Sequence, residues 1–156
     1  KEYRLRFKMT HQIKYNSFTP KVVYLTMSAD QNSISDSATT VQFDTITGDS
    51  GHGVSISSNL VTLTGGRHYW GFGCVVINRS STSDSQYTNF YDSSNNLLSV
   101  ANGYFESELP GGASSDSRVF QLSVSPSVDE SFYIKTENAD GNVLSDGTHF
   151  ILIEMS

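Results

Sequence analysis

The 156-residue chain is poor in cysteine and in charge, and it has no long apolar run. Its one cysteine, Cys74, excludes a framework of intramolecular disulfides, so stability must come from a hydrophobic core or from oligomerisation. No apolar stretch approaches the roughly 20 residues that a membrane-spanning helix needs, which argues against membrane insertion. Charged residues make up 17% of the chain against an average of about 25%, and Ser, Thr, Asn and Gly take their place. This composition is typical of a β-rich extracellular or virion protein.

Helical patterns are also lacking. No stretch has sustained apolar residues at i, i+3, i+4 and i+7 between a capping residue and a C-terminal glycine. Short segments of strand-forming residues recur instead, separated by polar clusters that favour turns, such as Asp30–Ser33 and Asn138–Asn142. The strands expected from this pattern are Tyr3–Met9, Val22–Met27, Val41–Ile46, Gly53–Ser57, Leu60–Thr64, Tyr69–Asn78, Gln86–Tyr91, Tyr104–Glu108, Val119–Val124, Ser131–Thr136 and Phe150–Met155. About ten short strands at this spacing predict one antiparallel sandwich or barrel.

Basic residues are concentrated at the N-terminus. The first 21 residues hold six basic groups and one acidic group (+5), whereas residues 22–156 hold four basic and fifteen acidic groups (−11). Such a body repels phosphate backbones and anionic lipid, which argues against nucleic-acid binding. In residues 3–9, large apolar residues alternate with basic ones, and this favours a strand over a free basic arm. We therefore divide the chain into an N-terminal strand or connector, residues 1–21, and a main domain, residues 22–156. Because the sequence begins with Lys1 and shows no signal peptide, we expect a fragment or a processed product.

One expected strand has no charged residue on either face. From Tyr69 to Ile77, both alternating sets of side chains are aromatic, aliphatic, glycine or cysteine. A sandwich strand with one solvent face should alternate between apolar and polar residues, so this strand should be covered on both sides. With no helix expected, a second subunit is the simplest cover, and the sequence predicts an oligomer. The last strand, Phe150–Met155, has the same character and should lie inside its sheet rather than at an edge.

Four segments resemble the globular-head family shared by complement and tumour necrosis factor (TNF) ligands. They are a Phe-containing strand (Val41–Ile46), a hairpin (Val54–Leu63), a Gly-containing turn before an aromatic-rich strand (Thr64–Phe72) and a closing strand (Asp146–Ile153). The resemblance implies an antiparallel jelly roll of about ten strands that assembles as a homotrimer. The residues then expected at the trimer interface are Tyr69, Trp70, Phe72, Phe150 and Leu152.

Trimers of this fold also form the distal heads of bacteriophage spikes, tail needles and fibres. The low charge and the Ser, Thr, Asn and Gly richness of the chain are similar to that branch of the family. The resemblance implies a location on the virion surface, outside the cell. Residues 1–21 would then join the head to a stalk or to another virion protein.

The groups that catalysis requires are scattered along the chain. Histidines occur at positions 11, 52, 68 and 149, and there is no Gly-x-Ser-x-Gly elbow and no His-x-x-x-His or Cys-x-x-Cys pair. His68 and Cys74, on the apolar strand, are interpreted as structural, with Cys74 a buried small hydrophobe. The loop aspartates at 84, 92, 116, 140 and 146 do not form a calcium-binding loop, and Asp140-Gly141 is interpreted as a turn. We therefore expect no enzymatic activity, no metal and no cofactor.

An aromatic cluster with amide and carboxylate neighbours favours sugar binding, because rings pack against a pyranose while Asn and Asp bond its hydroxyls. The candidate glycan-binding residues are Tyr87, Tyr91, Asp92, Asn95, Asn96, Asn102 and Tyr104. The alternative for the aromatic residues, Phe90 included, is packing in the core. The loops expected to make contact are Ser80–Tyr87 and Ser93–Tyr104, followed by Leu109–Ser117.

The leading hypothesis from the sequence is a non-enzymatic trimeric head that binds a host-surface receptor, a glycan in the first instance, through several weak sites acting together. A structural trimerisation or capsid-decorating module with no external receptor fits the same fold. A third hypothesis is a carbohydrate-binding module of an extracellular enzyme, which predicts a monomer with a row of exposed aromatic residues.

Overall fold

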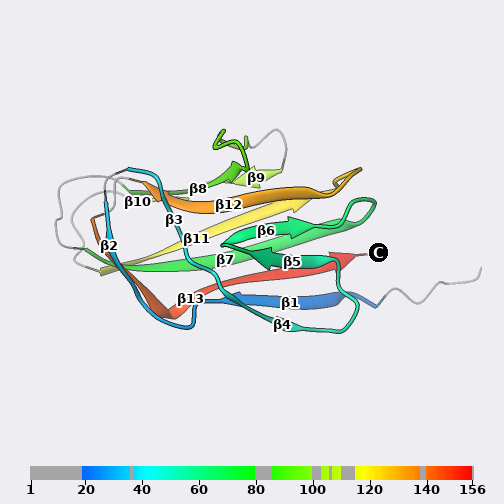
Figure 1. The fold of residues 1–156 in the computed structure, drawn as a ribbon, viewed down its shortest axis with the longest axis horizontal. Helices are drawn as coiled ribbons and strands as arrows, with labels where there is room; N and C mark the ends of the chain where they lie inside the picture. The colour runs from blue at the N-terminus through cyan, green and yellow to red at the C-terminus, as the bar shows by residue number, and fades with distance from the viewer. Residues whose placement is uncertain are drawn as a thin grey trace, which may run out of the picture.

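Two antiparallel β-sheets pack face to face in the computed structural model of the chain (Figure 1). The structure describes residues 19–35, 37–79, 86–99, 103–105, 107–109, 115–137 and 140–155. Within these ranges there are thirteen strands and no helix, and so none that could cross a membrane. The predicted all-β class is confirmed, with more strands than the expected ten or so because some are very short.

The first sheet has the strand order β4-β1-β13-β7-β11-β9, and β2 pairs with β13 beside this path. Its strands are β1 (Lys21–Thr26), β2 (Gln31–Ile34), β4 (Thr45–Gly48), β7 (His68–Arg79), β9 (Tyr104–Phe105), β11 (Ser115–Val124) and β13 (Gly141–Met155). The last strand, β13, lies between β1 and β7, so the prediction that it is not an edge strand is confirmed. Lys21 pairs with Glu154, and β1 therefore begins where β13 ends, at one end of the sandwich (Figure 1).

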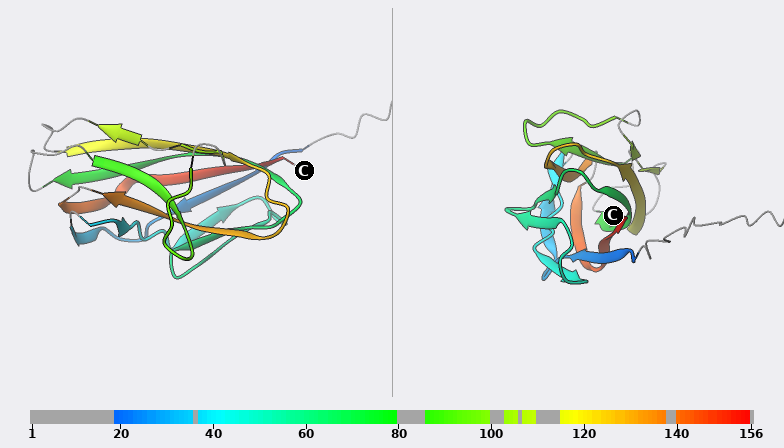
Figure 2. Two further views of the ribbon diagram at one scale, coloured as in Figure 1. Left: turned by 90° about the horizontal axis from the view of Figure 1, so that it is seen from above. Right: turned by 90° about the vertical axis from the view of Figure 1, so that its right-hand side faces the viewer.

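The second sheet has the order β10-β8-β12-β6-β5, and β3 pairs with β12. Its strands are β3 (Thr39–Thr40), β5 (Val54–Ser57), β6 (Leu60–Leu63), β8 (Gln86–Asp92), β10 (Ser107–Leu109) and β12 (Glu130–Glu137). The right-hand view of Figure 2 looks onto the end at which β13 ends and shows the strands surrounding the interior. The expected β5–β6 hairpin is confirmed, with Ser58 and Asn59 at positive φ (50° and 65°), as a two-residue hairpin turn requires.

The core between the sheets is aromatic, and Phe90 of β8 lies at its centre. Its ring centroid lies 5.0 Å from Tyr104, 5.6 Å from Phe120, 5.4 Å from Phe132 and 6.2 Å from Phe150. Because β8 and β12 belong to the second sheet and β9, β11 and β13 to the first, this cluster joins both sheets.

Two glycines of β7 leave room for these rings. A Cβ at Gly73 would lie 2.5 Å from Cζ of Phe120, and one at Gly71 would lie 2.9 Å from the Phe150 ring. The inward face of β7 therefore carries glycines at the positions where the Phe120 and Phe150 rings of its neighbouring strands pack against it.

The expected strand Val41–Ile46 is only partly a strand, since regular pairing begins at Thr45. The Val41 N–H donates to the carbonyl of Ile134 in the second sheet (2.9 Å), and the Asp44 N–H donates to that of Thr26 in the first (3.1 Å). The segment crosses from one sheet to the other and so cannot keep one ladder. Val41 and Phe43 are nevertheless buried, as the alternation of the sequence indicated.

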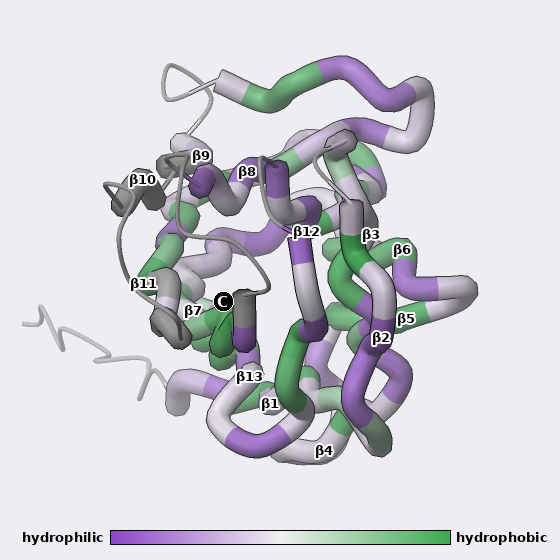
Figure 3. The backbone as a smooth tube through the Cα atoms, turned by 90° about the vertical axis from the view of Figure 1, so that its left-hand side faces the viewer, coloured by the Kyte–Doolittle hydropathy of each residue, from purple (hydrophilic) through white to green (hydrophobic). Residues whose placement is uncertain are grey.

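Two of the polar clusters expected to form turns, Asp30–Ser33 and Asn138–Asn142, contribute residues to strands instead. Gln31–Ile34 is β2, and Gly141 and Asn142 begin β13, whereas residues 138–139 lie outside the described ranges. The side chains bond the neighbouring strand, because the Ser33 N–H donates to Oδ1 of Asn142 (3.1 Å) and Ser145 donates twice to Oδ1 of Asp30 (2.7 Å each). Figure 3 shows β2 as largely hydrophilic, which explains why its composition suggested a turn.

The expected strand Tyr104–Glu108 divides between the sheets. Tyr104–Phe105 pairs with β11, whereas Ser107–Leu109 pairs with β8. The expected strand Tyr3–Met9 lies outside the described residues.

Candidate functional site

The outer face of the second sheet carries a group of tyrosine, lysine and glutamate side chains on β8 and β12, which we call the tyrosine face. Its members are Tyr87, Asn89, Tyr91, Tyr133, Lys135 and Glu137. Successive side chains of a strand point to opposite faces, so these alternate residues lie outside while Phe90, Phe132 and Ile134 point into the core. The register places Tyr91 opposite Tyr133 and Asn89 opposite Lys135.

The Glu137 carboxylate fixes one side of this face. Its Oε1 accepts a hydrogen bond from the Tyr91 hydroxyl and another from Nδ2 of Asn89 (3.0 Å). Burial, then the hydrogen bond to Glu137 and its charge, raises the pKa of Tyr91 to about 12. Tyr91 is therefore a neutral hydrogen-bond donor at ordinary pH, and its ring is held in one orientation.

Lys135 lies between the two tyrosine rings. Its Nζ is 5.0 Å from the ring centroid of Tyr91 and 5.7 Å from that of Tyr133, which is the range of cation–π contacts. The same ammonium donates to Oδ1 of Asn95, in the turn that follows β8. Lys135 therefore links the sheet face to that turn.

The turn after β8 is organised by Asp92. Its Oδ1 accepts from the N–H groups of Ser94 and Asn96 (2.8 Å each), and its Oδ2 accepts from Nδ2 of Asn96 (2.9 Å). The bond from the Asn96 side chain, with those from the Asn96 and Ser94 backbone, holds the pKa of Asp92 below its ordinary value. Asn95 has φ 67°, a left-handed conformation that asparagine tolerates well. The turn folds back beside β8, and this brings Asn95 to Lys135.

The structure brings together five of the seven residues proposed from the sequence for glycan binding. Tyr87 and Tyr91 lie on the tyrosine face, and Asp92, Asn95 and Asn96 form the turn beside it. Asn102 lies outside the described residues.

The prediction that Tyr104 binds glycan is wrong, because its side chain is only 1% exposed and packs in the aromatic core beside Phe90. Sequence reasoning missed Tyr133, Lys135 and Glu137. Their spacing of two along β12 was a signal that they share a face.

The outer face of the first sheet is different, since it is apolar. One row across β1, β13 and β7 holds Val22, Ile153 and Trp70, and the next row holds Tyr24, Ile151 and Phe72. We call these six residues the apolar face. Tyr24 and Trp70 are 44% and 42% exposed, and the Trp70 and Phe72 rings are 5.4 Å apart. Within the described part of the chain, therefore, large apolar side chains remain only partly covered on this sheet.

The residues proposed for a trimer interface divide between the two faces of the first sheet. Trp70 and Phe72 belong to the apolar face, whereas Tyr69, Phe150 and Leu152 have no exposed surface. These three point into the core, and a side chain enclosed by its own chain cannot contact another subunit.

Cys74, expected to be buried, is half-buried on the outward side of β7.

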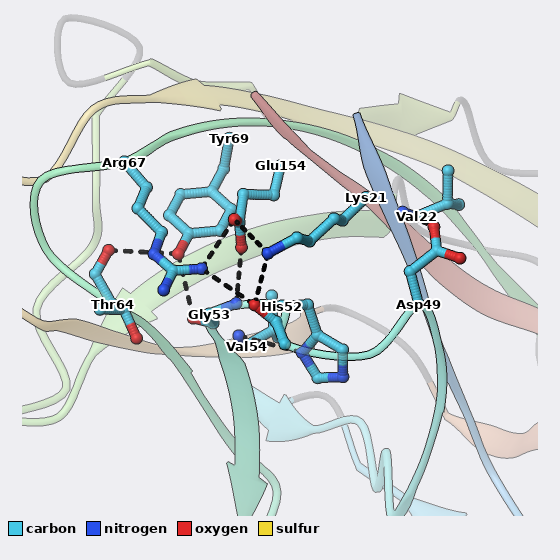
Figure 4. Close-up of polar contacts among 11 residues, drawn as sticks. Lys21, Val22, Asp49, His52, Gly53, Val54, Thr64, Arg67, Tyr69 and Glu154 are labelled. Atoms are coloured by element: carbon cyan, nitrogen blue, oxygen red, sulfur yellow. Dashed lines mark hydrogen bonds and ion pairs between the residues drawn. The ribbon is translucent and has the colours of Figure 1, made fainter. Parts of the chain in front are cut away.

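A buried carboxylate lies at the end of the sandwich where β1 begins and β13 ends (Figure 4). The Glu154 side chain is 0% exposed; its Oε1 is 2.7 Å from Nη1 of Arg67 and 3.7 Å from Nζ of Lys21. Its Oε2 accepts from the Gly53 N–H (2.5 Å). Burial raises the pKa of Glu154, but the bonds from Gly53 and Arg67 and the charges of Arg67 and Lys21 outweigh burial and lower it.

The same end is held by further contacts of the loop between β4 and β5. Lys21 Nζ donates to the Gly51 carbonyl (2.7 Å), and the Tyr69 hydroxyl lies 3.0 Å from the Gly53 carbonyl and 3.1 Å from that of Thr64 (Figure 4). Every group of this cluster bonds another group of the protein, which is the arrangement of a structural clasp between four segments of the chain.

The described histidines each bond a near neighbour. His52 Nδ1 accepts from the Val54 N–H (3.2 Å), His68 Nδ1 is 2.5 Å from the Ser125 hydroxyl, and His149 Nδ1 is 2.8 Å from the Gly147 carbonyl. His68 pairs with Met155 of β13. Met155 is six residues from His149 along that strand, a separation of roughly 20 Å. His68 and His149 therefore do not form a shared site.

The chain matches no model of a known protein family and no curated protein sequence. Its fold is similar to that of murine APRIL at pH 8.5, with a TM-score of 0.59 and 13% identity over 88% of this chain and 100% of that one. Eiger TNF from S. frugiperda gives a TM-score of 0.58 and 10% identity over 89% of this chain and 93% of that one. The vertex protein P5 of PRD1 gives 0.46 and 13% identity over 87% and 94%, a TM-score too low to indicate a shared fold. The likenesses to APRIL and Eiger TNF confirm the TNF-like jelly roll, and at such low identities they establish the fold alone.

Proposed function

We propose that this chain is the non-enzymatic head of a viral fibre, spike or tail needle, that it forms a homotrimer through the apolar face, and that it binds a saccharide of the host surface through the tyrosine face. The observation that carries the proposal is the position of the two faces on opposite sheets. One face can be buried between subunits while the other stays accessible on each of them.

The trimer is supported by the chemistry of the apolar face. Its two rows continue onto β11 as Ser123 and Gln121, so no charged side chain lies in them from β1 to β11. Exposed patches of large apolar residues mark interaction surfaces in soluble proteins, and an identical patch on a second and a third copy offers a partner of matching chemistry.

The trimer is tested by light scattering coupled to size exclusion. We expect about three times the 17.1 kDa of one chain for the native protein. Trp70→Asp should give a folded monomer, because a charge would be buried in the interface while the exposed side chain leaves the core intact. Val128→Asp, at a 73% exposed position outside the apolar face, is the matched control and should remain trimeric. A native monomer would overturn the proposal and favour a carbohydrate-binding module instead.

Saccharide binding is supported by the groups that the tyrosine face presents. Half-buried tyrosine rings offer apolar surface, and Asn95, Lys135 and Glu137 offer donors and acceptors that are already held in place by hydrogen bonds. Such a site needs little reordering on binding, which favours affinity for a small polar ligand. Three sites on one trimer would raise the overall affinity further.

Tyr133→Ala tests saccharide binding because it removes one ring and leaves the bond between Tyr91 and Glu137 in place. We expect about a tenfold loss of affinity for the oligosaccharide that binds native trimer best on a glycan array, the loss typical of one ring contact. Val128→Ala should bind as the native protein does. If the native trimer binds no saccharide and does not block adsorption of the parent particle, the head is instead a structural trimerisation or decoration module.

The location on a virion and the role of residues 1–21 as a connector to a stalk or another virion protein are also proposals. They are supported by the composition and by the basic character of the N-terminal segment, whose last residue, Lys21, begins β1. β1 begins with Lys21 at the end of the sandwich that holds the Glu154 clasp, and the clasp would fix the attachment point.

A further inference from the structure

The charged groups of the tyrosine face differ in how far the protein itself satisfies them. Asp92 accepts three hydrogen bonds through its two carboxylate oxygens, from the backbone of Ser94 and from the backbone and side chain of Asn96. Glu137 accepts two, from Tyr91 and Asn89. Both acidic groups of this surface are thus occupied by donors of the chain.

The basic group of the tyrosine face, Lys135, has fewer of its hydrogen-bonding groups occupied by the protein. Among the residues that the structure describes, both ion pairs are made by Glu154, with Lys21 and with Arg67. Lys135 therefore has no carboxylate partner within this part of the chain. One of its three N–H groups donates to Asn95, and its remaining contacts are with the faces of two tyrosine rings.

We infer that the tyrosine face takes a carboxylate-bearing saccharide, a uronic or sialic acid residue, whose carboxylate pairs with Lys135 while its ring packs on Tyr133. This inference rests on the proposed function and names the ligand class of the same site. An ammonium that has donors to spare and lies over two aromatic rings is already placed for an oxygen anion, and such charge-assisted bonds are about twice as strong as neutral ones.

The net charge of −6 determines how such a ligand would be held. The body of the protein does not attract anions from a distance, so binding must come from the contact with Lys135 itself. A single acidic sugar at the end of a glycan fits this condition better than a long polyanion, whose other charges would be repelled.

The test uses the native trimer and a panel of oligosaccharides that end in galacturonate, glucuronate or sialate, each paired with its methyl ester. The ester keeps the ring and removes the charge. We expect at least one acid to bind about tenfold more tightly than its ester, the effect of one charge-assisted bond. Lys135→Met, which keeps an apolar stem over the rings, should bind acid and ester equally weakly, whereas Lys135→Arg should keep the preference.

The control for charge is Val128→Glu, which lowers the net charge by one unit as Lys135→Met does, but at an exposed position seven residues earlier in the chain. It should keep the native preference. Equal binding of acids and esters by the native trimer, or an unchanged preference in Lys135→Met, would overturn the inference and leave saccharide binding intact. Binding of no saccharide in the panel or on the array would overturn the proposed function itself.

Discussion

Replacing Glu154 with glutamine is expected to lower the free energy of unfolding by about 2–3 kcal/mol. Removing one partner of a fully buried ion pair costs about 3–5 kcal/mol, and the effect is smaller here because the Arg67 and Lys21 side chains remain 30% and 32% exposed and can reach water. Chemical denaturation at pH 7 measures the change. Asp146→Asn, an exposed carboxylate on the same strand, is the control and should lie within about 0.5 kcal/mol of the native protein.

The difference in unfolding free energy between native protein and Glu154→Gln should also depend on pH, in a direction set by the pKa of Glu154. Because the pKa of Glu154 in the folded protein is lowered, its carboxylate stabilises the fold fully above its ordinary value of 4.5, and this stabilisation is lost as the pH falls through the folded pKa. The difference in unfolding free energy between native protein and Glu154→Gln should therefore narrow on acidification below 4.5. A difference that stays constant down to acid denaturation would show that the charge of Glu154 does not stabilise the fold.

Replacing Phe90 with alanine is expected to cost about 3–5 kcal/mol, the typical loss for a fully buried phenylalanine. Phe90 is 1% exposed and touches aromatic rings from both sheets, so its removal leaves a cavity at their junction. The midpoint of urea denaturation should fall markedly. Phe90→Leu, which refills most of the volume, should lose clearly less, and equal losses in the two variants would show that the site collapses around either side chain.

The sequence correctly predicts those strands in which burial determines where the apolar residues stand. In β7 and β13, apolar residues on both faces correctly indicated a position inside the sheet. The failures concern segments whose stability comes from particular partners. β2 consists mostly of polar residues and exists because Asp30 and Asn142 bond across to the neighbouring strand. Val41–Asp44 has a strand pattern but crosses between sheets, and no local pattern reports a change of sheet.

The candidate site was only partly predictable for a related reason. Tyr91, Asp92 and Asn95 are close in the sequence, so their cluster could be recognised. Lys135 and Glu137 reach it through the register of β8 with β12, which depends on pairing between distant segments. Tyr104 was predicted to lie on the surface but points into the core. Its strand has two residues, and alternation over so few residues cannot show which of them faces inward.

The position of β13 has a consequence for how the chain acquires its structure during synthesis. Among the strands that the structure describes, this one is synthesised after all the others, yet it lies between β1 and β7 and pairs with both. Until it is complete, the first sheet exists at most as two separate parts, and the core lacks Phe150 and Leu152. Folding therefore depends on contacts between the two ends of the described chain, a topology that folds slowly and leaves apolar strand edges open to aggregation in the meantime. Loss of the last strand would divide the first sheet in two.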